Sequence, residues 1–274
     1  MKQVLTIAGS DSGGGAGIQA DIKTFQELDV FGTSVITAVT AQNTRGVIDV
    51  APVPIENIEK QLQAVGDDFD IAAVKTGMLF DAVTIRTVAD SIKHYNWQRL
   101  VVDPVMIAKG GASLLKEEAK DSLIKHLLPL ATLVTPNIPE AEALSGIQIY
   151  NEQTRRMAAE QILKSGAQGV LIKGGHGADP DFTEDFYLDQ HGGSLVLRSS
   201  RIQTKHTHGT GCTFSAALAA EFAKGKSIEE AFLTAKQFIQ SAIEHSLNIG
   251  AGHGPTNHSA YRHYAQKEMI RYVH

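Results

Sequence analysis

The sequence predicts an α/β fold in which helices cover both faces of a mostly parallel sheet. Short β-rich segments alternate along the chain with longer helical patterns, as in repeated βαβ units. Most of these β-rich segments are apolar throughout rather than alternating, which is typical of strands buried on both faces. The chain has 274 residues, 43% of them hydrophobic and 20% charged, which fits one globular domain. We therefore expect residues 1–274 to form a single domain.

The expected elements follow from these patterns in chain order. Strands are expected at residues 4–8, 34–40, 72–76, 100–105, 132–135 and 169–173. Helices are expected at residues 16–28, 55–65, 82–95, 117–128, 154–165, 212–223 and 228–247. Two alternating strands, 185–189 and 194–200, are joined by the turn 190–193 and predict a hairpin at one edge of the sheet. The polar tail from Asn248 onward is expected to fold back over the surface.

Residues suited to binding and chemistry gather where the six parallel strands are expected to end. In open parallel sheets, ligands bind beyond the carboxyl ends of the strands. The segments concerned are Gly9-Ser10-Asp11, Gln42-Asn43, Gly77-Met78, Asp103-Pro104, Pro136-Asn137 and Gly174-Gly175. We expect all six to meet along one edge of the sheet, and this convergence indicates a site more strongly than any single motif does.

Charge and cysteine content exclude several classes of partner and environment. The formal net charge is −5, without long runs of either sign, so we expect neither nucleic acid nor an anionic membrane as a partner. The single cysteine excludes an intramolecular disulfide and fits a reducing compartment. The N-terminal apolar run breaks too early for a signal peptide, and no uncharged run approaches the ~18 residues of a membrane span. We expect a cytoplasmic protein.

A glycine-flanked loop before the Ala-rich helix is the segment around which a site is expected. In Gly209-Thr210-Gly211-Cys212 two glycines flank a threonine, and residues that favour a helix follow. The first amides of a helix have no intrahelical partner and the dipole is positive there, so a phosphate fits this place. Cys212 is expected to favour its thiolate beside the same helix end. A plain turn with a small buried cysteine is the alternative, and the loop alone does not decide between them.

The glycine-rich loop 9–17 closes the first expected strand. Its spacing fits neither the Rossmann nor the Walker pattern, so its glycines instead indicate close approach of the backbone to a small ligand. Asp21, one turn into the following helix, is a candidate hydrogen-bonding partner for that ligand. It is alternatively an acidic residue that the helix dipole favours.

Two carboxylates and one amide at strand ends are candidates for a Mg²⁺ site. Asn137 and Glu140 stand three apart at a helix start, where hard oxygen ligands suit Mg²⁺ held through water and phosphates. The same spacing is that of a helix cap with Asn137 as N-cap, and both roles are compatible. Asp103, just before Pro104, is either a further group facing the metal or a turn aspartate.

A lysine and several histidines complete the candidate groups. Lys173 precedes Gly174-Gly175 at a strand end, where it would neutralise phosphate charge; the alternative is a solvated lysine before a turn. The remaining histidines, including His253, His258 and His263, lack ligand-like spacing on a shared element. We expect them at the surface.

Taken together, these segments resemble the ribokinase-like superfamily and, within it, the bacterial hydroxymethylpyrimidine/phosphomethylpyrimidine kinases of thiamine biosynthesis. The match runs from Leu5 to about Pro255, with its blocks in one order along the chain. The blocks are Leu5-Thr6-Ile7-Ala8-Gly9-Ser10-Asp11, Ala16-Gly17-Ile18-Gln19-Ala20-Asp21, Ala41-Gln42-Asn43-Thr44-Arg45-Gly46-Val47, Lys75-Thr76-Gly77-Met78-Leu79, Asp103-Pro104-Val105-Met106, Thr135-Pro136-Asn137 to Glu140, Lys173-Gly174-Gly175-His176 and His208-Gly209-Thr210-Gly211-Cys212-Thr213.

The resemblance implies a three-layer α/β/α fold, ATP with Mg²⁺, and two successive phosphorylations. The first acts on the hydroxymethyl group of 4-amino-5-hydroxymethyl-2-methylpyrimidine and the second on the resulting monophosphate. It also implies a homodimer, and it leaves open whether a monovalent cation is needed.

By position, the resemblance also implies roles for individual residues. The pyrimidine pocket would be lined by Ala16, Asp21, Gln42, Met78 and Val105. Asn137, Lys173 and Thr210 would serve the nucleotide, and Glu140 and Asp103 the metal. Gly209, Gly211 and Cys212 would form the anion hole, with Cys212 where sugar-kinase relatives place an aspartate base.

The nearest alternative is a pyridoxine/pyridoxal kinase of vitamin B6 salvage with the same fold. Relatives specialised for vitamin B6 tend to differ at Gln42, Ala108 and Thr210, and some carry a second cysteine at the position of Ala108. The amide of Gln42 suits an aminopyrimidine edge better than a pyridinol. A non-catalytic vitamin-precursor binding protein and a Rossmann oxidoreductase are the alternatives from other classes, and the missing Gly-x-Gly-x-x-Gly spacing argues against the second.

Overall fold

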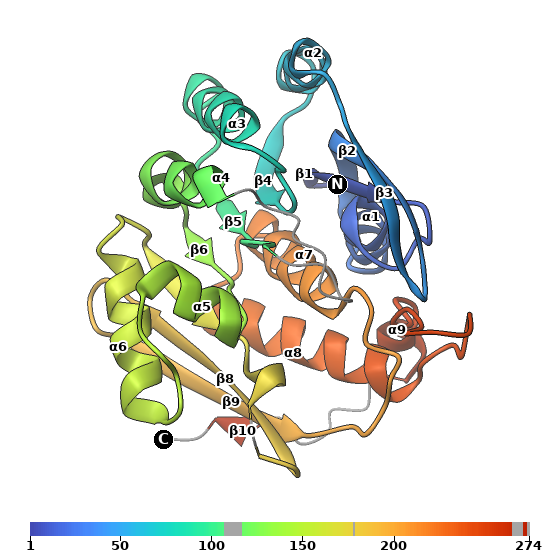
Figure 1. The fold of residues 1–274 in the computed structure, drawn as a ribbon, viewed down its shortest axis with the longest axis vertical. Helices are drawn as coiled ribbons and strands as arrows, with labels where there is room; N and C mark the ends of the chain where they lie inside the picture. The colour runs from blue at the N-terminus through green and yellow to red at the C-terminus, as the bar shows by residue number, and fades with distance from the viewer. Residues whose placement is uncertain (107–116, 178, 265–270, 273–274) are drawn as a thin grey trace.

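A twisted sheet forms the centre of the molecule, with helices on both of its faces (Figure 1). The computed structural model describes residues 1–106, 117–177, 179–264 and 271–272. Within them the strand order is β10-β9-β8-β7-β6-β5-β4-β1-β2-β3. The strands are β1 (Gln3–Asp11), β2 (Phe31–Asn43), β3 (Gly46–Pro52), β4 (Ile71–Thr76), β5 (Leu100–Val102), β6 (Leu133–Val134), β7 (Gly169–Ile172), β8 (Phe182–Asp189), β9 (Ser194–Ser200) and β10 (Arg271–Tyr272).

The helices and helical turns between these strands account for most of the remaining described residues. They are α1 (Gly17–Glu27), α2 (Ile55–Gly66), α3 (Ala82–His94), α4 (Glu117–Ser122), a π-helical turn (Leu123–Leu127), a 3₁₀ turn (Leu128–Leu130), α5 (Ile138–Ser145), α6 (Glu152–Leu163), a second 3₁₀ turn (Gly174–His176), α7 (Thr210–Ala223), α8 (Ile228–Glu244) and α9 (Ala260–Tyr264). None of the helices in the described ranges combines the length and apolar character needed to cross a bilayer.

The predicted parallel sheet is confirmed, and antiparallel strands extend it at both edges. β2, β1, β4, β5, β6 and β7 pair in parallel in that spatial order. The predicted hairpin is confirmed as β8 and β9, and β8 pairs antiparallel with β7. β3 and the short β10 were not expected. β3 lies at the edge beyond β2 and its residues are half-buried or exposed, and Asp49 interrupts its apolar residues, so it has no continuous apolar run like those of the central strands.

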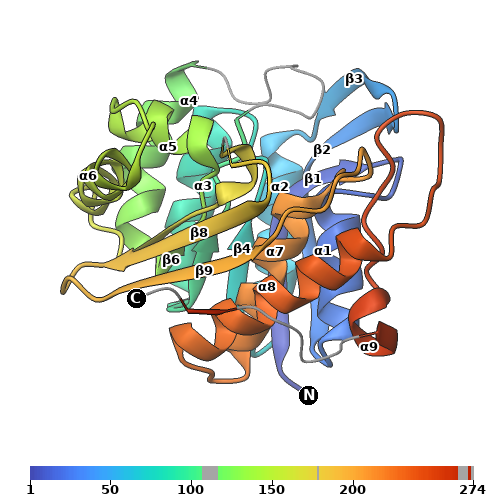
Figure 2. The same cartoon turned by 90° about the horizontal axis from the view of Figure 1, so that it is seen from below.

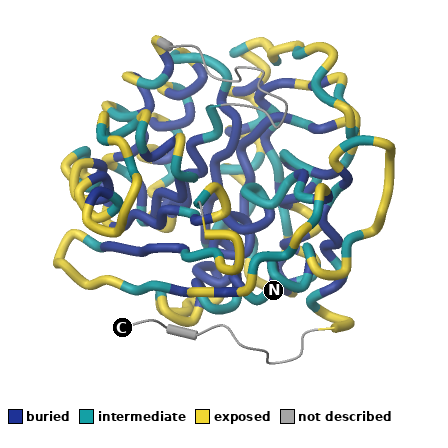
Figure 3. The backbone as a smooth tube through the Cα atoms, turned by 60° about the horizontal axis from the view of Figure 1, so that its bottom comes forward, coloured by how far each residue is buried: buried dark blue, intermediate teal, exposed yellow. Residues whose placement is uncertain are grey.

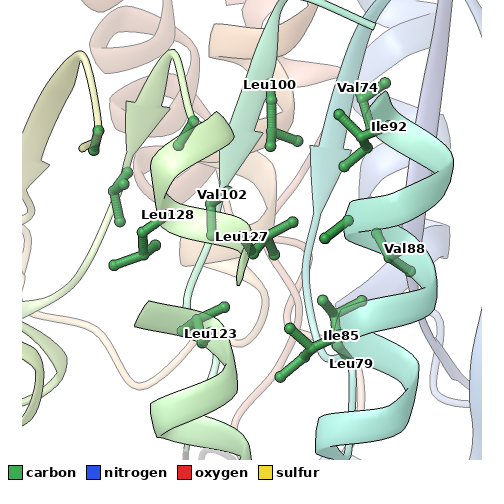
Figure 4. Packing of buried hydrophobic residues seen from close by; sticks show 14 of the residues in the cluster. Val74, Leu79, Ile85, Val88, Ile92, Leu100, Val102, Leu123, Leu127 and Leu128 are labelled. Atoms are coloured by element: carbon green, nitrogen blue, oxygen red, sulfur yellow. The ribbon is translucent and has the colours of Figure 1, made fainter. Parts of the chain in front are cut away.

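The apolar strands arise because neighbouring side chains enter two separate cores. In β1, Val4 packs with helices α1, α7 and α8, whereas the next residue, Leu5, packs with the helices on the opposite face. In β5 the same alternation places Val101 in the core that contains Val4, which we call the first core, and Val102 in the core that contains Leu5, the second core. Figure 2 shows α7 and α8 lying across one face of the sheet, and Figure 4 shows the second core between the sheet, α3 and the turn around Leu127. Side chains must therefore be apolar on both faces of these strands.

Most of the expected helices are present, with differences at their ends. The segment expected as helix 117–128 begins as α4 but continues as a π-helical and a 3₁₀ turn, and Pro129 lies in the latter. The last long helix, expected to reach 247, ends as α8 at Glu244. α7 is buried along almost its whole length. Figure 3 shows that buried backbone fills the centre of the molecule and that exposed backbone lies mostly at its periphery. Its small alanine side chains allow it to lie close to the sheet.

The tail folds back onto the molecule, as expected. The amide of His253 donates to the carbonyl of Thr44 at 2.7 Å, and the amide of Gly252 donates to the Thr44 hydroxyl at 3.1 Å. The amide of His208 donates to the carbonyl of Gly254 at 3.1 Å. The tail therefore connects the turn after β2 to the loop before α7.

The prediction that the remaining histidines lie at the surface is wrong for His206 and His208, which are buried, and for His258. Its side chain is buried, and its Nε2 lies 3.0 Å from the hydroxyl of Thr213 in the first turn of α7. Burial lowers the pKa of His258 to about 4. The fold-back of the tail, which brings His258 against α7, could not be read from local spacing.

We predict that His258 makes the protein less stable as the pH falls from 6.5 towards 4. In this window an unfolded histidine is protonated whereas His258 stays neutral in the fold, so the unfolded state binds more protons. At pH 5 the resulting loss is about 2 kcal/mol of unfolding free energy. His258→Gln should flatten the dependence of Tm on pH between 7 and 5. The exposed His94 supplies the control variant, His94→Gln, which should keep the wild-type slope; a wild-type slope in His258→Gln would contradict the prediction.

Candidate active site

Two adjoining cavities lie where the parallel strands end. The first has a volume of about 380 Å³ and the second about 280 Å³. The predicted strand-end segments meet here: Gly9, Ser10, Asp11, Gln42, Gly77, Met78, Asp103 and Asn137 line the first cavity, and Gly175 lines the second. The expected convergence along one edge of the sheet is confirmed.

The structure brings almost all of the predicted site residues to the first cavity. Its lining includes Ala16, Gln42, Met78, Val105, Asp103, Asn137, Glu140, Lys173, Gly209, Thr210, Gly211 and Cys212. Asn137, Lys173, Thr210 and Gly211 line the second cavity as well, so they stand at the junction of the two. Asp21 is the exception. Ala108 lies outside the described residues.

The start of α7 presents backbone amides at this junction. Gly209 is the N-cap residue, with φ of 84°, and a Cβ at this position would overlap the carbonyl oxygen of Gly15. Among the described residues, the amides of Gly211 and Cys212 have no backbone acceptor, and that of Thr210 has only the carbonyl of Thr207 at 3.4 Å. Unpaired amides and the positive end of the helix dipole together favour an anion at this place.

An ion pair lies directly in front of this helix start. Lys173 Nζ donates to Asp103 Oδ1 at 2.7 Å, and the Ser215 hydroxyl donates to Asp103 Oδ2 at 3.2 Å. A Cβ on Gly211 would lie 3.4 Å from Lys173 Nζ. Burial alone would lower the pKa of Lys173, but the carboxylates of Asp103 and Glu140 outweigh it and raise the pKa. Lys173 is therefore a cation, held beside the unpaired amides.

Asn137 and Glu140 form the helix cap that their spacing indicated. The Asn137 side chain accepts the Glu140 amide at 2.9 Å, and the Glu140 carboxylate accepts the Asn137 amide at 2.8 Å. Burial raises the pKa of Glu140 to about 7, Lys173 opposes this shift and Asp103 adds to it. A further cation near Glu140 would favour the ionised form of its carboxylate.

These two carboxylates suit a magnesium ion that is completed by other ligands. No group of three or more His, Cys, Asp and Glu side chains in the described ranges is placed to hold a metal ion. Mg²⁺ is usually held by one or two carboxylates together with water and substrate phosphates, rather than by a full set of protein ligands. Glu140 and Asp103 fit this pattern.

The glycine-rich loop after β1 is organised by Asp11, a role that sequence reasoning missed. Its carboxylate accepts the amides of Gly13 at 2.8 Å, Gly15 at 3.0 Å and Ala16 at 2.8 Å. The Nε2 of His208 lies 2.8 Å from Asp11 Oδ2. His208 thereby links this loop to the loop before α7. Hydrogen bonding by His208 lowers the pKa of Asp11 although burial opposes it. The signal in the sequence was an aspartate followed by glycines, a pattern typical of turns in which the side chain accepts nearby amides.

Gln42 lies at the first cavity near the same histidine. Its Nε2 is 3.3 Å from His208 Nε2, and its Oε1 accepts the Thr40 hydroxyl at 3.3 Å. The side chain is half-buried. Because His208 Nε2 donates to Asp11, it does not accept from Gln42, so the Gln42 amide keeps its donor hydrogens as well as an acceptor lone pair for a ligand edge.

The expectation that Asp21 lines the pocket is corrected by its position. Asp21 is fully buried, and its carboxylate accepts Lys75 Nζ at 2.9 Å and the Thr6 hydroxyl at 2.6 Å. The lysine, itself fully buried, lines the cavity in its place. Burial alone would lower the pKa of Lys75, but Asp21 outweighs it and raises the pKa. The signal for this missed residue was a lysine inside the otherwise apolar strand β4.

The expectation that Cys212 favours its thiolate is also corrected. Burial raises the pKa of Cys212 to about 11; Lys75 opposes this, and Asp21 and Asp103 add to it. Loss of hydration thus outweighs the helix start. Cys212 is a thiol near neutral pH.

We predict that alkylation of Cys212 by iodoacetamide rises with pH towards a midpoint near 11 in the folded protein. Because Cys212 is the only cysteine, one mass shift measures the reaction without interference. The same chain unfolded in urea is the control, and its thiol should titrate near the ordinary value of about 8.5. A folded-state plateau below pH 8 would contradict the prediction.

The strand ends of this mostly parallel sheet hold two adjoining cavities and a helix start with unpaired amides, an arrangement that defines a small-molecule kinase of ribokinase-like fold. More narrowly, residues 11–257 match the family model described as phosphomethylpyrimidine kinase, and the chain belongs to this family.

Individual relatives agree with this family assignment. The chain is 58% identical over 263 residues to the hydroxymethylpyrimidine/phosphomethylpyrimidine kinase of Haemophilus influenzae, covering 95% of this chain and 98% of that one. It is 56% identical over 264 residues to the protein of the same name from Bacillus subtilis, covering 96% of each. Among solved structures, the pyridoxal kinase from Staphylococcus aureus in complex with AMP-PCP and pyridoxal is 40% identical with a TM-score of 0.90, covering 100% of this chain and 98% of that one.

Proposed function

We propose that the protein transfers a phosphoryl group from ATP to 4-amino-5-hydroxymethyl-2-methylpyrimidine and then phosphorylates the resulting monophosphate. The observation that carries this proposal is the junction of the two cavities, where Lys173, Thr210 and Gly211 line both. An acceptor in the first cavity and a nucleotide in the second would meet at the unpaired amides of α7. Family membership supports the choice of acceptor.

The first cavity suits a flat aminopyrimidine. Met78, Val105 and Ala16 supply apolar walls, and Gln42 supplies an amide donor and acceptor. A pyrimidine ring with a neighbouring amino group presents the matching acceptor and donor along one edge. We therefore assign acceptor recognition to Gln42, with no direct contact from Asp21.

The junction suits the transferring phosphoryl group. Lys173 would neutralise phosphate charge while the Gly211 and Cys212 amides donate to its oxygens. Glu140 and Asp103 would hold Mg²⁺, which would neutralise charge on the phosphates when bound. Whether a monovalent cation also contributes is answered by assaying activity in sodium, potassium and tetramethylammonium salts.

Cys212 acts in this proposal as an orienting group for the acceptor. Because the pKa of Cys212 is about 11, very little of it is thiolate near pH 7, and the neutral thiol is a poor general base. Phosphoryl transfer passes through a loose transition state in which positioning and charge neutralisation do most of the work, so a strong base is not needed.

The direct test is release of ADP on mixing the protein with Mg-ATP and the pyrimidine alcohol. We expect turnover of both the alcohol and its monophosphate. Mass spectrometry should then detect the monophosphate and the diphosphate as products. A protein that binds the pyrimidine without consuming ATP would instead be the non-catalytic binder. Absence of turnover with both acceptors would overturn the proposal.

We predict that Cys212→Ala slows the first phosphorylation more than the second. The neutral alcohol of the first step gains from an orienting acceptor, whereas the phosphate of the second step is already an anionic nucleophile. The measurement is kcat for each step, with the alcohol and the monophosphate supplied separately as acceptors. Cys212→Ser is the companion variant, because it replaces the thiol by a hydroxyl that can still orient the acceptor. Equal losses in both steps would argue that Cys212 only shapes the loop.

A second activity, phosphorylation of pyridoxine or pyridoxal, is favoured by one observation. The Staphylococcus aureus structure of high similarity is a pyridoxal kinase. Kinetics with the pyrimidine alcohol, its monophosphate, pyridoxine and pyridoxal side by side would rank the acceptors. We expect the highest kcat/KM with the pyrimidines and a smaller value with pyridoxine, because Gln42 matches an aminopyrimidine edge.

The family resemblance also leads us to propose a homodimer. Light scattering coupled to size exclusion measures the mass directly, and the expected value is twice the chain mass of 29.4 kDa.

A further inference from the structure

A buried ion pair beneath the second cavity has no role in the chemistry described so far. Lys236 of α8 and Asp185 of β8 are 4% and 5% exposed. Lys236 Nζ donates to Asp185 Oδ2 at 2.7 Å and to the Thr183 hydroxyl at 3.1 Å. All three side chains line the second cavity. Figure 2 shows α8 running beside β8 and β9, the arrangement that brings the pair together.

The second oxygen of Asp185 reaches the loop that follows β7. Asp185 Oδ1 accepts the amide of Gly174 at 2.7 Å. A Cβ on Gly174 would overlap the carbonyl of Glu184, so the backbone here lies flush against β8. Only glycine permits this close approach, and the Asp185 carboxylate holds the Gly174 amide in position against β8.

Gly174 adjoins the groups assigned to the nucleotide phosphates. Lys173 is the preceding residue, and its Nζ holds Asp103 in front of α7. Gly175, the next residue, lines the second cavity, and its carbonyl accepts Arg201 at 3.0 Å. A shift of the Gly174 backbone would therefore move both the Lys173 ammonium and one wall of that cavity.

Stability alone is a weak reason for such a pair. Removing two charges from water is costly, and apolar replacements of a buried pair are often neutral or stabilising. A role in fixing the position of the neighbouring backbone accounts for a charged pair at this site.

We propose that the Lys236–Asp185 pair positions the nucleotide-binding loop, by holding the Gly174 amide and through it Lys173. This inference rests on the proposed function, in which ATP occupies the second cavity. Both residues are positioning residues and not catalytic ones.

The test compares two double variants that remove both charges together, so that neither leaves an unpaired charge in the core. Asp185→Asn/Lys236→Met keeps a side-chain oxygen for the Gly174 amide, whereas Asp185→Leu/Lys236→Met does not. Affinity for Mg-AMP-PCP is measured by calorimetry, and KM is measured separately for ATP and for the pyrimidine alcohol. We expect the Leu/Met variant to bind the nucleotide about tenfold more weakly, the loss typical of one hydrogen bond to a buried amide, and the Asn/Met variant to stay within about threefold of wild type. KM for the pyrimidine alcohol should be unchanged in both.

Further variants keep the test decisive if the Leu/Met protein does not fold. Gly174→Ala leaves the ion pair intact but forces the loop away from β8, and it should weaken nucleotide binding by a similar factor. The exposed pair Arg156–Glu160 supplies the matched control, because Arg156→Met/Glu160→Gln removes an ion pair far less buried and should leave nucleotide affinity unchanged.

The possible outcomes separate this inference from the proposed function. Wild-type protein that does not bind Mg-AMP-PCP would overturn both. Wild-type binding together with unchanged affinity in Gly174→Ala, or equal losses in the Asn/Met and Leu/Met variants, would overturn the positioning role alone. A change confined to Tm would assign the pair a structural role and reject the inference.

Discussion

The ion pair between Lys173 and Asp103 in front of helix α7 is the interaction on which the rest of the site depends. A lysine cation beside the positive end of a helix dipole is unfavourable by itself, because the two positive charges repel each other when no anion is bound between them. Asp103 compensates at 2.7 Å, and Ser215 from the same helix holds the other carboxylate oxygen. The end of β5, the end of β7 and the first turns of α7 are thereby joined at one point. The fold can present an anion site without leaving its charge uncompensated.

The same solution recurs around the two cavities. Lys75 pairs with Asp21 at 2.9 Å behind the first cavity, and Lys236 pairs with Asp185 at 2.7 Å beneath the second. Each of these pairs connects a strand of the sheet to a helix on the face that carries α1, α7 and α8. Each buried charge therefore keeps a partner when ligands leave. Breaking one partner of such a pair is strongly destabilising, so each pair fixes the relative position of the two elements that it joins.

How much of this could be predicted from the sequence depended on the range of the interactions. The strand ends, the Asn137–Glu140 cap and the β8–β9 hairpin follow from neighbouring residues, and the structure has all three. The carboxylate of Asp21 was assigned to the ligand because it stands near the start of a helix, but its partner Lys75 is 54 positions away. The buried state of His258 depends on the tail reaching α7. β3 escaped notice because an edge strand needs no continuous apolar pattern.

The pKa of Cys212 shows why its position at a helix start was not enough to predict its protonation state. A helix start lowers the pKa of a thiol, but partial burial in the wall of the first cavity raises the pKa of Cys212, and this loss of hydration prevails. Under the proposed function the two acceptors make different demands on this wall. The alcohol arrives neutral and gains little from a cationic site, whereas its monophosphate arrives charged and requires one. The thiol, the paired lysines and the unpaired amides of this wall are all in place before a substrate binds. The same wall can therefore accept both substrates, because the negative charge that distinguishes them belongs to the substrate and is compensated by groups that are already fixed.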